Sequence, residues 1–303
     1  MSAPEGYIPG FVCTLDTCSV EQWGFVRYRP SVAGNVLFLV IMAVLACGQI
    51  FLGIKNKTKG FMIAICLGLL TETVGYIARV LLNGNPFSRD YFLWYLITLT
   101  IGPVFIAAAI YLTLGRIVVV NGEAISRIKP RSYTTFFLGC DIIDVGTNIL
   151  VAGLSIQVAC LFAFTACSLE FLWRVKKNPE MRNPEFTDLV NSKKYKLFLF
   201  ALFSATAFLF IRTVFRSVEL SEGFGGKLAN QEVEFMILDG TMIILACLCL
   251  TIFHPGVGFG KRWNEAEFQF RTSKAKINAE ETPQTITPGG SEKVAPETSA
   301  ERL

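Results

Sequence analysis

The sequence has little charge and a single histidine, and both shortages narrow the class of protein. Charged residues make up 17% of its 303 residues, whereas a soluble domain carries about 25%. One imidazole leaves no histidine pair for a metal site. The patterns GxxxxGK followed by Ser or Thr, HExxH, CxxC and GxSxG are missing as well, which removes the familiar phosphate-binding, zinc and nucleophile motifs. We therefore expect a protein that is not an enzyme and that carries no cofactor or metal.

Hydrophobic residues are abundant instead, at 52% of the chain, and they are clustered. A helix needs about 20 mainly apolar residues to cross a hydrocarbon core of about 30 Å. Five segments meet this condition, and they are residues 32–54, 61–82, 91–120, 197–218 and 235–253. A further apolar stretch covers residues 136–172. The pattern predicts an all-α polytopic membrane protein with six clear spans.

Basic residues occur mainly in alternate connections between the spans. Thirteen of them lie in three connections, at Lys55, Lys57, Lys59, Arg127, Lys129, Arg131, Arg174, Lys176, Lys177, Arg182, Lys193, Lys194 and Lys196. The other connections and the segment before the first span hold four, which are Arg27, Arg29, Arg89 and Lys227. Cytoplasmic loops are enriched in Lys and Arg. The distribution therefore places the N-terminus outside the cell and the tail in the cytoplasm, and such basic loops suit anionic lipid rather than nucleic acid.

The stretch at residues 136–172 conflicts with this arrangement. Basic connections flank it on both sides, so an even number of crossings should lie between them. Its 37 residues would form a helix of about 55 Å, which is too short for two full spans and a turn. Three interpretations remain open: a short re-entrant hairpin, a basic loop on the unexpected side, or residues missing relative to an intact design.

The chain divides into three parts by composition. Residues 1–31 are expected to be an extracellular segment, residues 32–256 a transmembrane bundle and residues 257–303 a disordered cytoplasmic tail rich in Thr, Pro, Ser and Gly. In the first part, Cys13 and Cys18 are expected to form either a small disulfide or two free thiols.

Several ionisable residues fall inside the predicted spans, where each needs a partner, a water-filled cavity or a substrate. Glu72, Tyr76 and Arg79 share one helical face because their spacing is four and three. The same spacing recurs in Arg212, Arg216 and Glu219, and Asp239 in the last span is a suitable counter-ion for either arginine. Asp141 and Gln157 add polarity to the ambiguous stretch, and Arg116 is expected to extend to the cytoplasmic headgroups.

Two interpretations of these groups are open: they tie helices together, or they line one polar cavity for the headgroup of an amphiphile. A mutual ion pair between Glu72 and Arg79 is one way to neutralise that face.

With these residues in view, the chain resembles the fungal lipid-translocating exporter family, which includes aminocholesterol-resistance and sphingoid long-chain-base resistance proteins. The resemblance covers residues 28–256 and rests on an ordered set of positions. They are Tyr28, Pro30, Ser31, Asn35, Glu72, Gly75, Tyr76, Arg79, Pro103, Phe105, Ala107, Ala108, Tyr111, Arg116, Gly153, Leu154, Gln157, Arg212, Arg216, Glu219, Gly223, Gly226, Glu234, Asp239, His254, Pro255 and Gly256.

The resemblance implies a seven-span-type bundle with its N-terminus outside. It also implies that the fourth and fifth span region is shortened here, because Asp144 runs almost directly into the Gly-Leu-x-x-Gln span. We expect a transporter or resistance protein for amphipathic lipids such as sphingoid long-chain bases, without its own ATPase, in the plasma membrane or alternatively the vacuolar membrane. Its expected partners are membrane lipids and amphipathic small molecules. The alternative hypotheses are a seven-span lipid sensor and an inert truncated paralogue.

Overall fold

A computed structural model describes residues 13–122, 150–178, 180, 183–223, 226, 228–260 and 262–266. The chain forms two compact units, Met1–Phe268 and Gln269–Leu303. The second unit lies outside the described residues, so the account below concerns the first unit alone.

Six helices of the described residues are long and apolar enough to cross a membrane. Five are α2 (Val32–Lys55), α3 (Lys59–Gly84), α4 (Arg89–Asn121), α6 (Leu150–Lys177) and α8 (Lys193–Ser221). The sixth covers Glu232–Gly258 and consists of α9 (Glu232–Phe235), the π-helix η5 (Met236–Thr241), α10 (Met242–Ile252) and α11 (Pro255–Gly258). The short helix α1 (Val20–Trp23) precedes α2, and the short helices η3 (Pro184–Phe186), α7 (Thr187–Asn191) and η4 (Leu228–Asn230) lie in connections between the spans. The described part of the chain contains no strand, which confirms the prediction of an all-α polytopic membrane protein.

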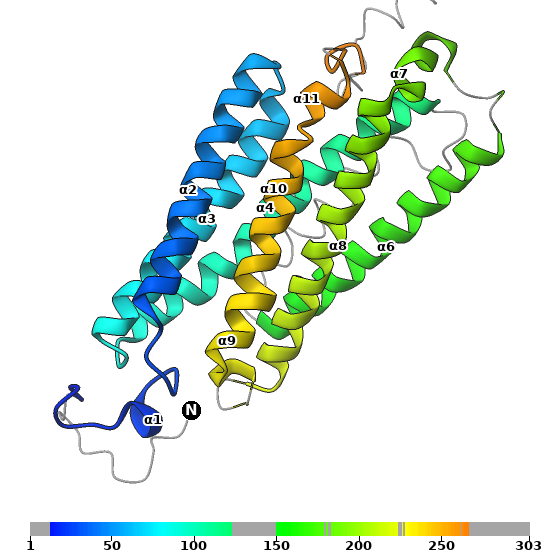
Figure 1. Ribbon diagram of the computed structural model, residues 1–303. Helices are drawn as coiled ribbons and strands as arrows, with labels where there is room; N and C mark the ends of the chain where they lie inside the picture. The colour runs from blue at the N-terminus through cyan, green and yellow to red at the C-terminus, as the bar shows by residue number, and fades with distance from the viewer. Residues whose placement is uncertain are drawn as a thin grey trace, which may run out of the picture. The chain divides into compact units, whose positions relative to one another are not determined.

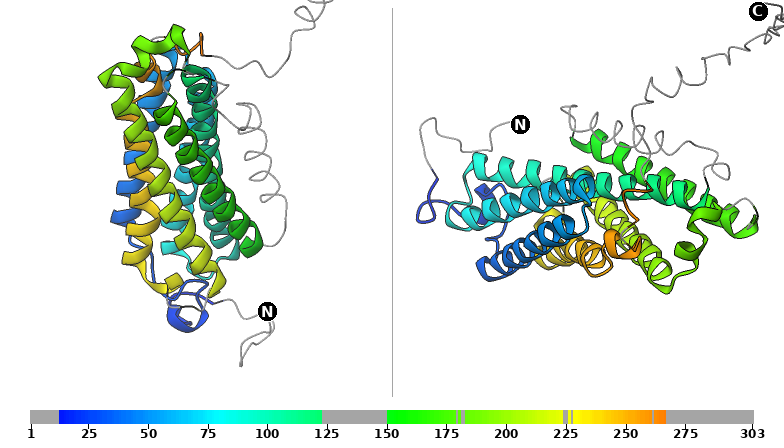
Figure 2. Two further views of the ribbon diagram at one scale, coloured as in Figure 1. Left: turned by 90° about the vertical axis from the view of Figure 1, so that its right-hand side faces the viewer. Right: turned by 90° about the horizontal axis from the view of Figure 1, so that it is seen from above.

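The helices run nearly side by side between two ends (Figures 1 and 2). We name the end that carries α1 the amino-terminal end, and the end that carries Lys55, Lys59, Lys177 and Lys193 the basic end. Helices α2, α4, α6 and α10 run toward the basic end, whereas α3 and α8 run back. Serine side chains begin three of these helices: Ser31, Ser88 and Ser192 each accept a hydrogen bond from a backbone amide in the first turn of α2, α4 and α8.

Helix α6 is one complete crossing and is parallel to α4. The Tyr111 ring on α4 lies 4.5 Å from the Phe164 ring on α6, and α4 ends beside the start of α8, where Asn121 Nδ2 donates to Tyr195 Oη at 2.8 Å. Because α6 leads through α7 into that same start, both α4 and α6 end at the basic end (Figure 1).

This arrangement excludes one of the three interpretations for the residues that it describes. A re-entrant hairpin is wrong for residues 150–177, since they form one continuous helix. A basic loop on the unexpected side stays open, because Arg127, Lys129 and Arg131 lie outside the described residues. The connection itself, residues 123–149, lies outside the described residues, together with the predicted site residue Asp141.

Two exposed tryptophans mark the two ends of the bundle surface. Trp94, in the second turn of α4, is 56% exposed, and Trp173, near the end of α6, is 61% exposed. Tryptophan is enriched where a membrane meets water, because its ring is apolar and its indole N–H is polar. Exposed Leu, Ile, Val and Phe side chains on the helices between these levels are suited to contact with lipid tails. The chain is an integral multi-pass membrane protein.

The residues after His254 pack onto the basic end of the bundle. Phe259, Trp263 and Ala266 are buried, and Gly256 fits against Asn56, whose Cβ would lie 2.3 Å from a Cβ added at that glycine. The Arg116 guanidinium lies 4.2 Å from the Trp263 ring centroid and donates to the Trp263 carbonyl oxygen. The expectation that Arg116 extends to lipid headgroups stays a prediction, and this segment gives the guanidinium a partner within the chain as well.

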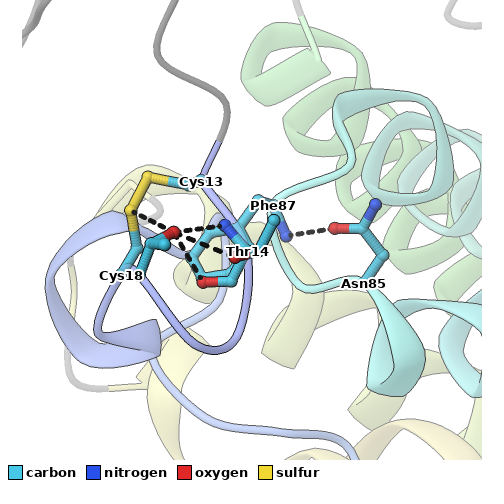
Figure 3. The surroundings of a disulfide bond; sticks show 6 residues. Cys13, Thr14, Cys18, Asn85 and Phe87 are labelled. Carbon is cyan, nitrogen blue, oxygen red and sulfur yellow. Dashed lines mark hydrogen bonds between the residues drawn. A yellow bond between two sulfur atoms is a disulfide. The ribbon is translucent and has the colours of Figure 1, made fainter.

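The amino-terminal segment contains the disulfide that the sequence left open. Cys13 and Cys18 are bonded, and their Cα atoms are 5.4 Å apart. Figure 3 shows the turn that they close, in which the Cys18 amide donates to the Thr14 carbonyl, near the loop of Asn85 and Phe87 that joins α3 to α4. The bond closes only a short loop, so its effect is local.

Candidate functional site: a buried ionic cluster

Three arginines and three carboxylates are buried in the half of the bundle nearer the amino-terminal end. Arg79, Arg212 and Arg216 are at most 1% exposed, and Glu72, Glu219 and Asp239 at most 4%. They come from α3, α8 and the π-helix η5. We call these six residues the ionic cluster. Ionisable side chains at membrane depth are rare and mark pathways or substrate sites, so this concentration is the strongest candidate site in the described residues.

Arg212 is shared between two carboxylates on different helices. Its Nη2 atom lies 3.1 Å from Glu72 Oε1 and 3.3 Å from Asp239 Oδ1. The same nitrogen donates to the carbonyl oxygen of Leu99 in α4. One guanidinium therefore joins α3, α4, α8 and η5, and it offers two negatively charged groups a single positive partner.

Arg216 forms the second connection of the cluster. Its Nη1 atom donates to Glu219 Oε2 at 2.7 Å, within the same helix. Its Nε atom lies 3.7 Å from Asp239 Oδ1. Asp239 thus faces both arginines of α8, as the sequence predicted for a counter-ion in the last span.

Arg79 is held differently from the other two arginines. Its Nε atom donates to Asn35 Oδ1 and its Nη2 atom to Tyr28 Oη, both at 3.0 Å, and its guanidinium lies 3.9 Å from the Phe235 ring centroid. The ion pair between Glu72 and Arg79 that the sequence allowed is not formed, because Glu72 pairs with Arg212 instead. Arg79 is a cation held by neutral groups and aromatic faces.

The π-helix explains how Asp239 reaches its position. One extra residue in a turn of helix changes the direction of the following side chains, and such turns are frequent at functional sites. Thr241 Oγ1 donates to the Met236 carbonyl, five residues earlier, which ties this wide turn from within. Asp239 lies in this wide turn, and its carboxylate reaches both arginines of α8.

Several polar atoms of the site are buried without a hydrogen-bond partner. They are Glu72 Oε2, Tyr76 Oη, Arg212 Nε, Arg216 Nε and Nη2, and both oxygens of Asp239. A buried polar atom without a partner normally costs about 1–3 kcal/mol, so each needs an explanation. One oxygen of Glu72, both oxygens of Asp239 and the Tyr76 phenol lack a hydrogen-bond donor in one region, and they are suited to a ligand that brings several N–H or O–H groups.

Two glycines give the cluster its close packing. A Cβ at Gly102 in α4 would lie 2.5 Å from Glu72 Oε1, and one at Gly240 in η5 would lie 2.5 Å from Tyr76 Oη. These distances are shorter than contacts that Cβ atoms make. The backbones of α4 and η5 therefore approach the Glu72 and Tyr76 side chains as closely as only glycine permits.

The structure brings together seven of the nine residues predicted for the site. Glu72, Arg212, Arg216, Glu219 and Asp239 form one network of ion pairs, Tyr76 lies against Gly240, and Arg79 lies over Phe235, which also faces Arg216 at 5.7 Å. Gln157 is buried on α6, but none of these ion pairs reaches it. Asp141 is outside the described residues.

Sequence reasoning did not assign Asn35, Tyr28 and Phe235 to the site, although the first two belonged to the resemblance. Asn35 gave a signal, because it is a polar residue in the first turn of an otherwise apolar span. Phe235 gave none, since the sequence contains 26 phenylalanines.

The fold and the site together define a class of protein: a helical membrane protein whose bundle contains an ionic cluster with equal numbers of positive and negative groups. The family described as RTA1 like protein matches residues 65–145 and 143–262, which is most of the bundle. The chain belongs to this family. Its two matches meet at residues 143–145, next to the junction where the sequence predicted missing residues.

Curated yeast proteins resemble the chain over most of its length. The "Sphingoid long-chain base transporter RSB1" of Saccharomyces cerevisiae (strain Lalvin EC1118) is 29% identical over 283 residues, covering 77% of this chain and 74% of that protein. The "Protoporphyrin uptake protein 1" of Saccharomyces cerevisiae (strain S288c) is 26% identical and covers 77% and 93%. "Protein RTM1" of the same species is 26% identical and covers 68% and 70%. No solved structure matches the chain.

The first of these alignments is longer than the part of this chain that it covers. It has 283 positions, and 77% of 303 residues is about 233, so about 50 positions have no residue of this chain. The third interpretation of the ambiguous stretch, in which residues are missing at the junction, stays a prediction.

Proposed function

We propose that this protein exports amphipathic lipids or protects against them, with sphingoid long-chain bases as its first substrate class, and that it does so in the plasma membrane. The observation that carries the proposal is the ionic cluster, whose carboxylates Glu72 and Asp239 share one arginine and keep oxygens without donors. The name of the 29% identical yeast transporter supports the same class of substrate.

The cluster suggests how a long-chain base would be held. The ammonium group of such a base brings three N–H donors, and Glu72 Oε2, Asp239 Oδ2 and Tyr76 Oη are three acceptors without a donor. The hydrocarbon chain would lie along apolar helix surface, where it loses no hydrogen bonds.

Charge balance adds a condition to this binding. The cluster has three positive and three negative groups, so an entering ammonium would leave one positive charge in excess. Binding would therefore weaken the contacts of Arg212 with Glu72 and Asp239. We propose that Arg212 gives way to the headgroup and returns when the headgroup leaves, which would couple occupancy to the packing of α8 against α3.

Arg79 supports a second candidate, an amphiphile that carries carboxylates. It is a buried cation whose described partners are the neutral groups of Asn35 and Tyr28 and aromatic faces, so an acidic headgroup would gain an ion pair there. The yeast relative named for protoporphyrin uptake makes this class worth testing.

Growth in the presence of a toxic long-chain base tests the proposal directly. The full chain, expressed in a yeast strain that lacks its own transporter of this kind, is expected to permit growth at several-fold higher base concentration than the empty vector. Efflux of a labelled base should rise in the same cells. Unchanged tolerance and efflux, with the protein present at the cell surface, would contradict the proposal. Raised uptake of protoporphyrin in that case would favour the second candidate.

Removing the segment after the bundle separates export from signalling. A chain that ends at residue 268 keeps the packed residues 262–266 and loses the second unit, Gln269–Leu303. We expect this variant to retain full tolerance to long-chain bases, because every residue of the ionic cluster remains. The sensor hypothesis, which the relatives' names do not support, expects tolerance to fall with the loss of the tail. The same growth assay therefore distinguishes the two.

A further inference from the structure

A second polar site lies at the basic end of the bundle. A cavity of about 500 Å³ is lined there by Lys57, Lys59, Gly60, Arg116, Trp263 and Asn264. Three of these six residues carry a positive charge and none carries a negative charge. Small-molecule sites have volumes of about 300–1,000 Å³, so the cavity has room for a headgroup larger than a single ion.

The connection between α2 and α3 builds one wall of this cavity from strained backbone. Lys57 has φ 56°, in the left-handed region, and it is the one residue other than glycine with positive φ in the described chain. A residue with a side chain is disfavoured there and persists only where the surroundings enforce it, which is frequent at binding sites. This turn, in which the Thr58 amide donates to the Gly53 carbonyl at the end of α2, places Lys57 at the cavity beside Lys59.

The start of α3 adds backbone donors to the same wall. Thr58 precedes the helix, but its side chain makes no capping hydrogen bond, and its Oγ1 atom is buried without a partner. The amides of the first turn therefore lack the side-chain acceptor that Ser192 provides to α8 at the same end. An uncapped helix start carries partial positive charge and favours anions.

The opposite wall is held by the segment after α11. Arg116 is fixed against Trp263 by the contacts of its guanidinium with the ring and the carbonyl of that residue. The carboxylate next along the chain, Glu265, is engaged by Arg262, with Nε and Oε2 2.5 Å apart. The charged residues that line the cavity, Lys57, Lys59 and Arg116, are thus all positive.

We propose that this cavity binds the phosphate of an anionic membrane lipid, with a phosphoinositol headgroup as the class that fits. The ligand chemistry is a phosphomonoester, whose two negative charges match Lys57 and Lys59 while its oxygens accept from the first amides of α3. A lipid source is favoured because the spans α2 and α3 end at Lys55 and begin at Lys59, which puts the cavity at headgroup level, where basic residues attract anionic lipid. This site is separate from the ionic cluster and does not depend on the proposed function.

Binding of a short-chain lipid to the purified full chain tests the proposal. The protein is placed in phosphatidylcholine nanodiscs and titrated with dioctanoyl phosphatidylinositol 4-phosphate, and affinity is measured by microscale thermophoresis. We expect saturable binding that weakens on the order of 30-fold in the double variant Lys57→Gln and Lys59→Gln, because each lysine near the surface contributes about a factor of five to ten.

A matched control removes the same charge at the same end but outside the cavity. Lys193 and Lys194 are both exposed at the start of α8, so the double variant Lys193→Gln and Lys194→Gln is expected to bind as the unmodified protein does. An equal loss of lipid affinity in both double variants would show that the lipid is attracted to basic surface in general, and it would overturn the proposed site.

A second variant keeps the test decisive if the double variant unfolds. Lys57→Gly removes one charge at a backbone position that glycine prefers, so stability should be kept or raised while affinity falls about fivefold or more. Unchanged affinity would overturn the proposal. Free inositol 1,4-bisphosphate is titrated in parallel as the soluble headgroup. If it binds as tightly as the lipid does, the proposal that the ligand is a membrane lipid is wrong.

Discussion

Replacing Glu72 by Gln, or Asp239 by Asn, is expected to remove most of the tolerance to long-chain bases that the protein confers. Each substitution keeps the size of the side chain and removes one negative charge from a cluster that holds three of each sign. The cluster would then carry one excess positive charge, and an ammonium headgroup would be repelled where it had been attracted. We expect growth on a toxic base to fall to near that of the empty vector and efflux to fall at least tenfold.

The carboxylates could instead have a structural role, in which they only tie helices together. A variant that removes one charge of each sign distinguishes this role from binding of the headgroup. Removing one partner of a buried ion pair costs about 3–5 kcal/mol in soluble proteins, because the other charge is left unpaired. The double variant Glu72→Gln and Arg212→Gln removes both charges that meet at 3.1 Å. This double variant should therefore recover the surface expression that Glu72→Gln alone loses.

The two roles then predict opposite results for the double variant. If Glu72 only ties helices together, the double variant should regain tolerance together with expression. If Glu72 holds the headgroup, tolerance should stay low in a protein that is present at the surface. Glu170→Gln, at an exposed ion pair with Arg174 on α6, is the matched control and should change neither quantity.

The spans were predictable from the sequence because a bilayer imposes a length and a composition on every helix that crosses it. The predicted segment 32–54 differs from α2 by one residue at its C-terminal end. The stretch 136–172 was less predictable, since periodicity cannot say where within it a helix begins. The direction of α6 came from its contacts with α4 and α8, which no local pattern encodes.

The partners within the ionic cluster show the limit of spacing arguments. The four-and-three spacing placed Glu72 and Arg79 on one face of α3 and allowed an ion pair between them within the helix. The helix actually directs Glu72 toward Arg212 of α8 and Arg79 toward Asn35 of α2. Asp239 was assigned correctly because it is the carboxylate within the last predicted span, 235–253, so few alternatives existed.

Arg116 illustrates a different limit. A cation at the end of a span normally extends to the headgroups, and the mainly polar composition after Gly256 argued against the packing of residues as far as Ala266 on the bundle. Phe259 and Trp263 in that segment were the signal available, as large apolar residues in an otherwise polar stretch. Their burial makes Arg116 part of the bundle and of the cavity at the basic end.

The substitution Gly102→Ala should abolish export while leaving every charge of the cluster in place. The added Cβ would lie 2.5 Å from Glu72 Oε1, 2.8 Å from its Cγ and 2.9 Å from its Cδ. These atoms belong to the end of a flexible side chain, so Glu72 can move aside without displacing α3 or α4. Both charges of the Glu72 and Arg212 pair stay in the cluster, so the protein is expected to fold and reach the surface, with a stability cost of about 1–3 kcal/mol.

The displaced carboxylate would lose its position against Arg212 and beside Tyr76, and with it the geometry proposed for the headgroup. We expect tolerance to long-chain bases to fall nearly as far as in Glu72→Gln. Gly84→Ala is the matched control, because a Cβ there meets nothing within 4 Å. Full tolerance in Gly102→Ala would mean that the position of Glu72 is unimportant, and the cluster would then be a structural tie. Selective loss in this variant, with normal expression of both, would instead show that export depends on the position of the Glu72 carboxylate, since the net charge of the cluster would be unchanged.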